Sequence, residues 1–166
     1  MPEMTLVGWF HTALGALSIA AGLYSLARHR VIRASNRSGA LFLLCTLVTA
    51  LSALTIFQNG GFNIAHLLAV MTLLAVAVGW SAEYRRLGGR YAIYLQAMSY
   101  SATFLFHMIP AITDGLRRLP IGDPVVSEIN DPLLLGFYQL FLLCYLLGVA
   151  LQWRWLRRTA SVQPAG

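Results

Sequence analysis

The chain has 166 residues, of which 58% are hydrophobic and only 11% are charged. A soluble domain averages about 25% charged residues, and a soluble fold this apolar would expose large apolar patches to water. The formal net charge is +6 and is carried by arginine, because the chain contains no lysine. These arginines lie in short clusters at the ends of apolar blocks, where membrane proteins carry their topology signals. The composition therefore excludes most soluble classes and argues against nucleic-acid binding.

The first two apolar blocks predict membrane-spanning helices over residues 5–27 and 39–57. Each is close to the roughly 20 residues that cross a bilayer, and lipid favours helices because every backbone polar group must be paired internally. His11 lies in the first span, and Gly15 follows it one turn later on the same face. Small residues, which let membrane helices approach closely, mark one face of each span: Gly15, Ser18 and Gly22 in the first, and Thr46, Ala50 and Ala53 in the second.

The next two blocks predict spans over residues 62–82 and 91–115. His66 lies near the start of the third span, and Asn63 precedes it by one turn. His107 lies in the fourth span. Three polar residues share its helical face: Tyr100, Thr103 and Asp114.

The last apolar block predicts a fifth span over residues 134–155, with Tyr138 and Gln139 near its outer end. The expected fold class is an all-α integral membrane bundle of about five transmembrane helices. We expect one transmembrane domain over residues 1–158, followed by a disordered cytoplasmic tail over residues 159–166.

Arginine placement predicts the orientation of the bundle. Most arginines lie in the loops after the first and third spans and in the tail after the fifth: Arg28, Arg30, Arg33, Arg37, Arg85, Arg86, Arg90, Arg154, Arg157 and Arg158. With five spans these three segments share one side of the membrane, which the positive-inside rule makes cytoplasmic. The amino terminus is then outside and the carboxyl terminus in the cytoplasm.

Three of the four histidines lie inside predicted spans. At 1.5 Å rise per residue, His11, His66 and His107 lie roughly 9, 6 and 12 Å below the outer ends of their spans. Helix tilt covers this spread, so we expect the three imidazoles in one layer near the outer face. Ionisable residues inside a membrane are costly and usually face the bundle interior. The sequence therefore predicts a site in this layer.

Three kinds of chemistry suit such a layer. Imidazole is an axial ligand to haem iron, so two histidines could hold haem b while the third hydrogen-bonds a quinone or a propionate, with Gly15 giving the macrocycle room. Three histidines could instead bind copper or zinc and leave a fourth position open. The histidines could also only join helices by hydrogen bonds. Ligand histidines usually donate their second N–H to a partner, and the candidate partners are Asn63, Tyr100, Thr103, Asp114, Tyr138 and Gln139.

The chain resembles a bacterial family of small membrane proteins, the "domain of unknown function 2306" family. The resemblance rests on residues 11–15, on the turn from Arg33 to Gly39 and on residues 62–72, and it covers roughly residues 8–110. That family usually has a histidine before an arginine in its first cytoplasmic loop, and Asn36 stands near that place here. The resemblance implies a multi-helix bundle with histidines in a bacterial inner membrane.

The leading functional expectation is a haem b-binding membrane protein of electron transfer, with a quinone or another membrane protein as redox partner. The first alternative is a copper or zinc site for metal handling, oxidase assembly or metal-assisted hydrolysis. The second alternative is a non-catalytic scaffold or accessory subunit. The small-residue face of the first span would also suit a second copy of the chain in a homo-oligomer.

Overall fold

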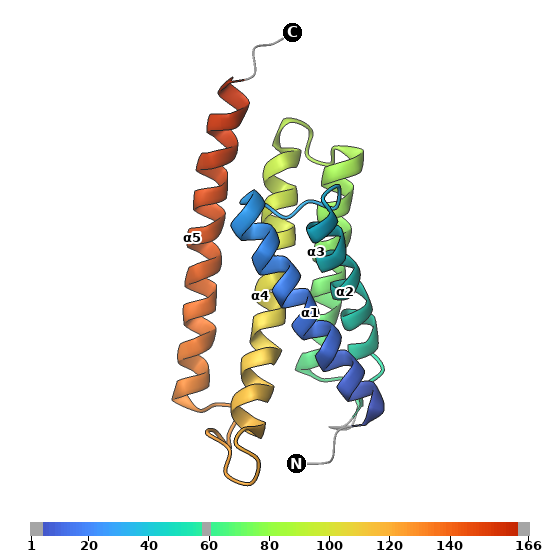
Figure 1. The fold of residues 1–166 in the computed structure, drawn as a ribbon, viewed down its shortest axis with the longest axis vertical. Coiled ribbons are helices and arrows are strands. Elements are labelled where there is room, and N and C mark those ends of the chain that lie inside the picture. Colours follow the sequence, from blue (N-terminus) through green and yellow to red (C-terminus); the bar gives the residue numbers. More distant parts are fainter. Residues whose placement is uncertain (1–4, 58–60, 163–166) are drawn as a thin grey trace.

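The computed structural model describes residues 5–57 and 61–162, with side chains up to residue 159. It contains five α-helices, and a short 3-10 helix, η1 (Gly89–Tyr91), precedes the fourth. The α-helices are α1 (Leu6–His29), α2 (Arg37–Ala53), α3 (Ile64–Arg85), α4 (Ala92–Arg118) and α5 (Pro132–Val162). Figure 1 shows α1 to α4 side by side in a bundle, with α5 standing along its edge.

The described chain is all helical, as the sequence predicts, and each helix lies within a few residues of a predicted span. Three of the helices, α1, α3 and α5, are long and apolar enough to cross a membrane. The largest difference is at the end of α5. The helix continues through residues 159–162, where the sequence predicted a disordered tail, while residues 163–166 lie outside the described part of the chain. Leu, Arg and Ala residues around this end favour a helix over disorder.

Helix α4 is the centre of the bundle, because it contacts α1, α2, α3 and α5. Its buried polar residues are Gln96, Tyr100, Thr103 and His107. They recur every three or four residues and so form one stripe along the helix. The polar side of α4 therefore faces the other helices, and its remaining surface is mostly apolar.

The core between α2, α3 and α4 is built around two aromatic side chains. Phe42 and Tyr100 are both fully buried and belong to one cluster. Tyr100 packs against the backbone of α3 at Gly79, where an added Cβ would lie only 2.4 Å from the tyrosine ring. Gly79 therefore sets how closely α3 and α4 approach.

The loop between α1 and α2 is fixed by side chains from all three later helices. The carboxylate of Glu83, on α3, accepts hydrogen bonds from the backbone N–H groups of Ala34 and Ser35 at 2.8 and 3.0 Å. The amide of Gln96, on α4, donates to the carbonyl of Ile32. Gln152, on α5, donates to the carbonyl of Arg30 at 3.0 Å. These bonds hold the loop against the bundle at the end where most arginines lie, which we call the arginine-rich end.

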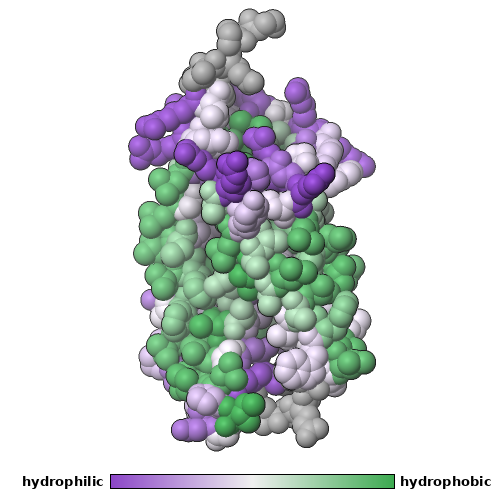
Figure 2. Space-filling view, viewed as in Figure 1, coloured by the Kyte–Doolittle hydropathy of each residue, from purple (hydrophilic) through white to green (hydrophobic). Residues whose placement is uncertain are grey.

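The surface divides into bands along the bundle axis. Figure 2 shows hydrophilic side chains gathered at the arginine-rich end, above a broad hydrophobic band that covers the middle of the molecule. Many large apolar side chains are exposed, including Leu23 on α1, Leu74 on α3 and Leu147 on α5. Such a band is what a lipid-facing surface requires, and it would be a liability in water.

Gly79→Ala should destabilise the bundle, because the ring of Tyr100 is fully buried and cannot shift without disturbing its neighbours. Overpacking of this kind costs about 1–3 kcal/mol, and it should appear as a lower midpoint of thermal unfolding in detergent, followed by circular dichroism. Gly136→Ala is the matched control, since an added Cβ there meets no atom within 4 Å. Equal midpoints for the two variants would contradict the proposed contact.

Glu83→Ala should also lower the unfolding midpoint, because two backbone N–H groups lose a charged acceptor. Hydrogen bonds to charged groups contribute about 1.5–3 kcal/mol. Glu128→Ala, which removes a carboxylate in the exposed loop before α5, should leave the midpoint unchanged. An unchanged midpoint for Glu83→Ala would show that the loop holds its position without this carboxylate.

Candidate functional site

His107 joins three helices through hydroxyl groups. It projects from α4, and its Nε2 lies 3.0 Å from Oγ1 of Thr46 on α2 and 3.4 Å from Oγ of Ser18 on α1. The two hydroxyls lie 2.8 Å from each other, and Ser18 donates to the carbonyl of Phe42 at 3.2 Å. All three side chains are buried. This buried group, Ser18, Thr46 and His107, is called the hydroxyl–imidazole cluster below.

The direction of these hydrogen bonds follows from counting hydrogens. Each hydroxyl has one hydrogen to donate. The hydrogen of Ser18 goes to Phe42, so Thr46 donates to Ser18, and Nε2 of His107 donates to Thr46. The chain of donors assigned in this way leaves Nδ1 as the nitrogen of His107 with a free lone pair.

His11 makes a similar contact farther from the arginine-rich end. Its Nδ1 lies 3.0 Å from Oγ of Ser52, and Ser52 donates to the carbonyl of Thr49 at 2.9 Å. Nδ1 of His11 is therefore the donor to Ser52. His11 lies near enough to His107 and to Asp114 for electrostatic interaction with both. The structure thus places His11 and His107 against the same helix, α2, at positions about 9 Å apart along its axis.

His66 has a different role, at the first turn of α3. Its Nδ1 accepts a hydrogen bond from the backbone N–H of Asn63 at 3.3 Å, and Oδ1 of Asn63 accepts one from Ala65 at 2.9 Å. The two residues form a reciprocal cap of the helix. The imidazole packs against the rings of Phe57 and Phe62, with centroids 4.8 and 5.3 Å away. Its remaining nitrogen, Nε2, is buried without a partner among the described residues.

The three imidazoles do not form one group in the described part of the chain. Within residues 5–57 and 61–159, no set of three His, Cys, Asp or Glu side chains is placed to hold a metal ion. His11 and His107 share a neighbourhood against α2, while His66 makes its contacts with Asn63, Phe57 and Phe62. Equal predicted depth is not enough to bring side chains together, because each helix must also be rotated so that its histidine faces the others.

A haem between α1 and α4 does not fit the packing seen here. The ring of Phe42 lies edge-on to His107, with centroids 6.1 Å apart. At Gly22 an added Cβ would lie 2.8 Å from Phe42 and 2.9 Å from Phe104. Gly15 faces α2, where an added Cβ would meet Thr49 at 3.9 Å, an ordinary packing distance. Gly15 therefore faces a helix contact in this structure.

The other predicted partners are spread over the molecule. Asn63 contacts His66 as its spacing suggested, but as a helix cap. Thr103 donates to the carbonyl of Tyr100 at 2.8 Å, and the hydroxyl of Tyr100 lies near Glu83. Tyr138 pairs with Thr113 at 2.6 Å. Asp114 forms an ion pair with Arg118 at 3.7 Å, and Gln139 is exposed on α5.

Sequence analysis assigned Ser18 and Thr46 to close helix packing and missed their bonds to His107. One signal was present in the sequence. His11, Ser18 and Ser25 are spaced by seven residues on α1, so they share a face, and two of them are polar residues that are fully buried. A polar stripe of this kind in an apolar helix indicates hydrogen bonds to neighbouring helices.

Comparison with known proteins assigns no family. No protein-family model matches the chain, and no curated protein or solved structure matches it either. The resemblance to the "domain of unknown function 2306" family therefore stays a prediction.

The hydrogen bond between His107 and Thr46 is measurable by a double-mutant cycle. We expect Thr46→Val and His107→Leu to be coupled by about 0.6–1.7 kcal/mol, the range found for hydrogen bonds between membrane helices. The measurement is the free energy of unfolding by sodium dodecyl sulfate in mixed micelles. The control cycle combines Thr46→Val with His29→Leu at the end of α1, and its coupling should be near zero. Strict additivity of the first pair would contradict the contact.

Proposed function

We propose that the protein is a non-catalytic bundle of the bacterial inner membrane, acting as a scaffold or accessory subunit whose buried histidines fasten its helices. All five helices span the bilayer in this proposal, with the amino terminus outside and the carboxyl terminus in the cytoplasm. The observation that carries the functional part is the hydroxyl–imidazole cluster, in which His107 bonds to hydroxyls on two other helices.

Two features support five spans rather than three. Helix α4 holds its polar stripe against four neighbouring helices, so its lower apolar content is compatible with a span in the centre of a bundle. Helix α2 is shorter, with 17 residues, but it lies within the same bundle between α1 and α3. A bundle of helices that pack along one another supports membrane crossing by all of them.

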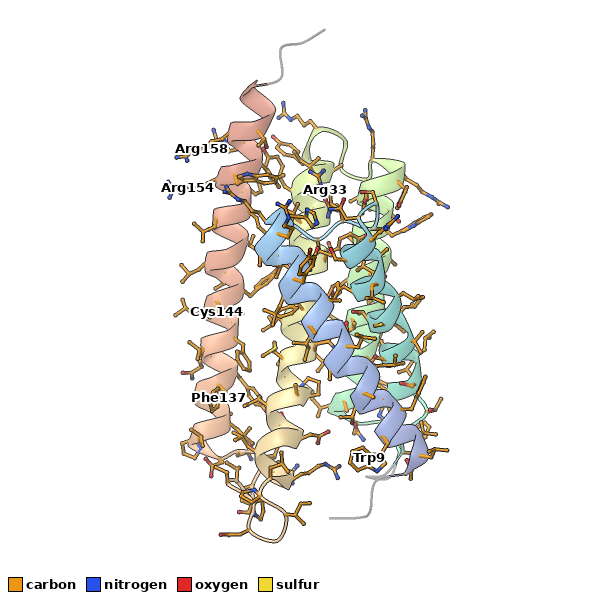
Figure 3. All side chains as sticks on the ribbon, in the orientation of Figure 1. Trp9, Arg33, Phe137, Cys144, Arg154 and Arg158 are labelled. Atoms are coloured by element: carbon orange, nitrogen blue, oxygen red, sulfur yellow. The ribbon has the colours of Figure 1, made fainter. Side chains whose placement is uncertain are left out.

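Charge distribution supports the orientation. Figure 3 labels Arg33 in the loop after α1 and Arg154 and Arg158 on α5, all at the same end of the bundle. The opposite end also carries Arg117 and Arg118, but with the acidic residues Asp114, Asp123, Glu128 and Asp131. The positive-inside rule then places the arginine-rich end in the cytoplasm.

The roles of the three histidines favour fastening over ligation. Each already uses one ring nitrogen in a bond that positions a helix: His107 across α4, α1 and α2, His11 across α1 and α2, and His66 in the cap of α3. In His66 it is Nδ1 that faces the backbone N–H and the side chain of Asn63, so this nitrogen serves the cap of α3. Lipid provides no hydrophobic driving force for helices to associate, so hydrogen bonds of this kind help to decide which membrane helices pack together.

A second candidate retains haem b or a copper or zinc ion at His11 and His107. Its support is that a ligand histidine normally donates one N–H to a fixed partner and binds metal through the other nitrogen. With the donor directions assigned above, His11 donates to Ser52 and His107 donates to Thr46. Nε2 of His11 and Nδ1 of His107 then keep free lone pairs. This candidate requires α1 and α4 to repack around the group.

Absorption spectroscopy and metal analysis of the purified protein separate the two proposals. For the fastening role we expect no Soret band, copper and zinc far below one per chain, and a lower unfolding midpoint for His107→Ala than for the control His29→Ala. A Soret band that shifts on reduction and is lost in His11→Ala and His107→Ala would overturn the proposal. Near-stoichiometric copper or zinc that is lost in the same variants would overturn it as well.

A further inference from the structure

A cavity of about 690 Å³ lies between α1, α4 and α5, on the side of the bundle away from α2 and α3. It exists because the backbone of α5 runs close to α4 but not to α1 over the described residues. This volume is within the range of small-molecule and cofactor sites in proteins. None of the three intramembrane histidines lines it, so the cavity is separate from the hydroxyl–imidazole cluster.

The walls of the cavity change character along the bundle axis. Its deeper part is lined by apolar side chains such as Phe104, Leu105 and Met108 on α4 and Phe141 on α5. The part near the arginine-rich end is lined by Arg30, Arg154 and Arg158. The distance from Phe141 to Arg154 along α5 is about 20 Å, which exceeds the roughly 15 Å half-thickness of the bilayer hydrocarbon. The cavity thus runs from headgroup level to about the middle of the membrane.

The mouth of the cavity is held in shape by a short polar network. Gln152 accepts a hydrogen bond from Ser101 on α4 at 3.0 Å and donates one to the carbonyl of Arg30 at the end of α1. The guanidinium of Arg30 lies over the ring of Trp155, 6.0 Å from its centroid. These contacts tie α5 to both other helices at this level and fix Arg30 at the rim.

We propose that this cavity binds one anionic phospholipid from the cytoplasmic leaflet, with its phosphate among the arginines and an acyl chain along the apolar wall. The inference takes the five-span arrangement proposed above as given, and it is independent of what the histidines do. Basic pockets between helices on the cytoplasmic side are typical sites for anionic headgroups. The opening between α1 and α5 faces the bilayer, so a lipid reaches the cavity without leaving the membrane.

The experiment measures thermal unfolding of the full chain in neutral detergent micelles doped with phosphatidylglycerol or phosphatidylcholine. We expect phosphatidylglycerol to raise the midpoint at lower concentration than phosphatidylcholine, and inorganic phosphate to have no effect. The double variant Arg30→Gln and Arg154→Gln should raise the half-saturating phosphatidylglycerol concentration by about fivefold per arginine. The matched control, Arg28→Gln with Arg157→Gln, removes the same charge from the same two helices outside the cavity and should leave that concentration unchanged.

A second pair of variants tests the apolar part. Gly148 lines the cavity, and an added Cβ there meets no atom within 4 Å. Gly148→Phe should fill the space and remove the lipid effect, while Gly136→Phe, at an equally open position outside the cavity, should keep it. The proposal would be overturned if phosphatidylglycerol and phosphatidylcholine raised the midpoint equally, or if both arginine pairs weakened the phosphatidylglycerol effect equally. It would also be overturned if phosphatidylglycerol still raised the midpoint of Gly148→Phe fully. The lipid experiment does not depend on the orientation of the protein, because micelles have no sidedness. The proposed function is tested by absorption spectra and metal analysis instead, so failure of the lipid proposal is distinct from failure of the proposed function.

Discussion

The whole structure depends on pairing polar side chains inside an apolar bundle. A buried donor or acceptor without a partner is costly, so polar side chains that bond across helices decide which helices lie next to each other. Helix α4 concentrates this constraint, because its stripe from Gln96 to His107 points into the bundle. His107 contacts hydroxyl groups of α1 and α2. Gln96, nearer the arginine-rich end, donates a hydrogen bond to the loop between those two helices. The position of α4 at the centre follows from this need.

Two kinds of polar contact hold different parts of the molecule. The hydroxyl–imidazole cluster joins helices deep in the apolar band, where close packing through Gly22 and Gly79 also brings backbones together. At the arginine-rich end, Glu83 and Gln152 fix a loop rather than a helix pair, by binding backbone groups that no regular element satisfies. The first kind sets which helices are neighbours, and the second sets how their ends are connected.

Much of the fold was predictable from sequence, and little of the site was. Apolar blocks of about 20 residues and breaks rich in arginine or glycine identify helices reliably, because length and polarity alone decide whether a segment is stable in lipid. The same counting predicts the depth of His11, His66 and His107 in a bilayer, and this depth stays a prediction. Counting residues could not predict whether the three imidazoles contact one another, because that depends on the rotation of each helix about its own axis. This rotation is set by contacts such as Phe42 with Phe104 and Gly79 with Tyr100. For the same reason Ser18 and Thr46 were taken as packing residues although their hydroxyls bind His107.

Helix α5 packs its backbone along α4 over the described residues, and this has a consequence for biogenesis. The first four helices form their mutual contacts without any residue of α5, so the emerging chain can complete a four-helix unit before its last segment leaves the ribosome. We therefore expect α5 to dock in a separate, late step, guided by Ser101, Gln152 and Arg30 at the arginine-rich end. Truncation after residue 131 should consequently yield an inserted, helical remnant instead of a degraded one.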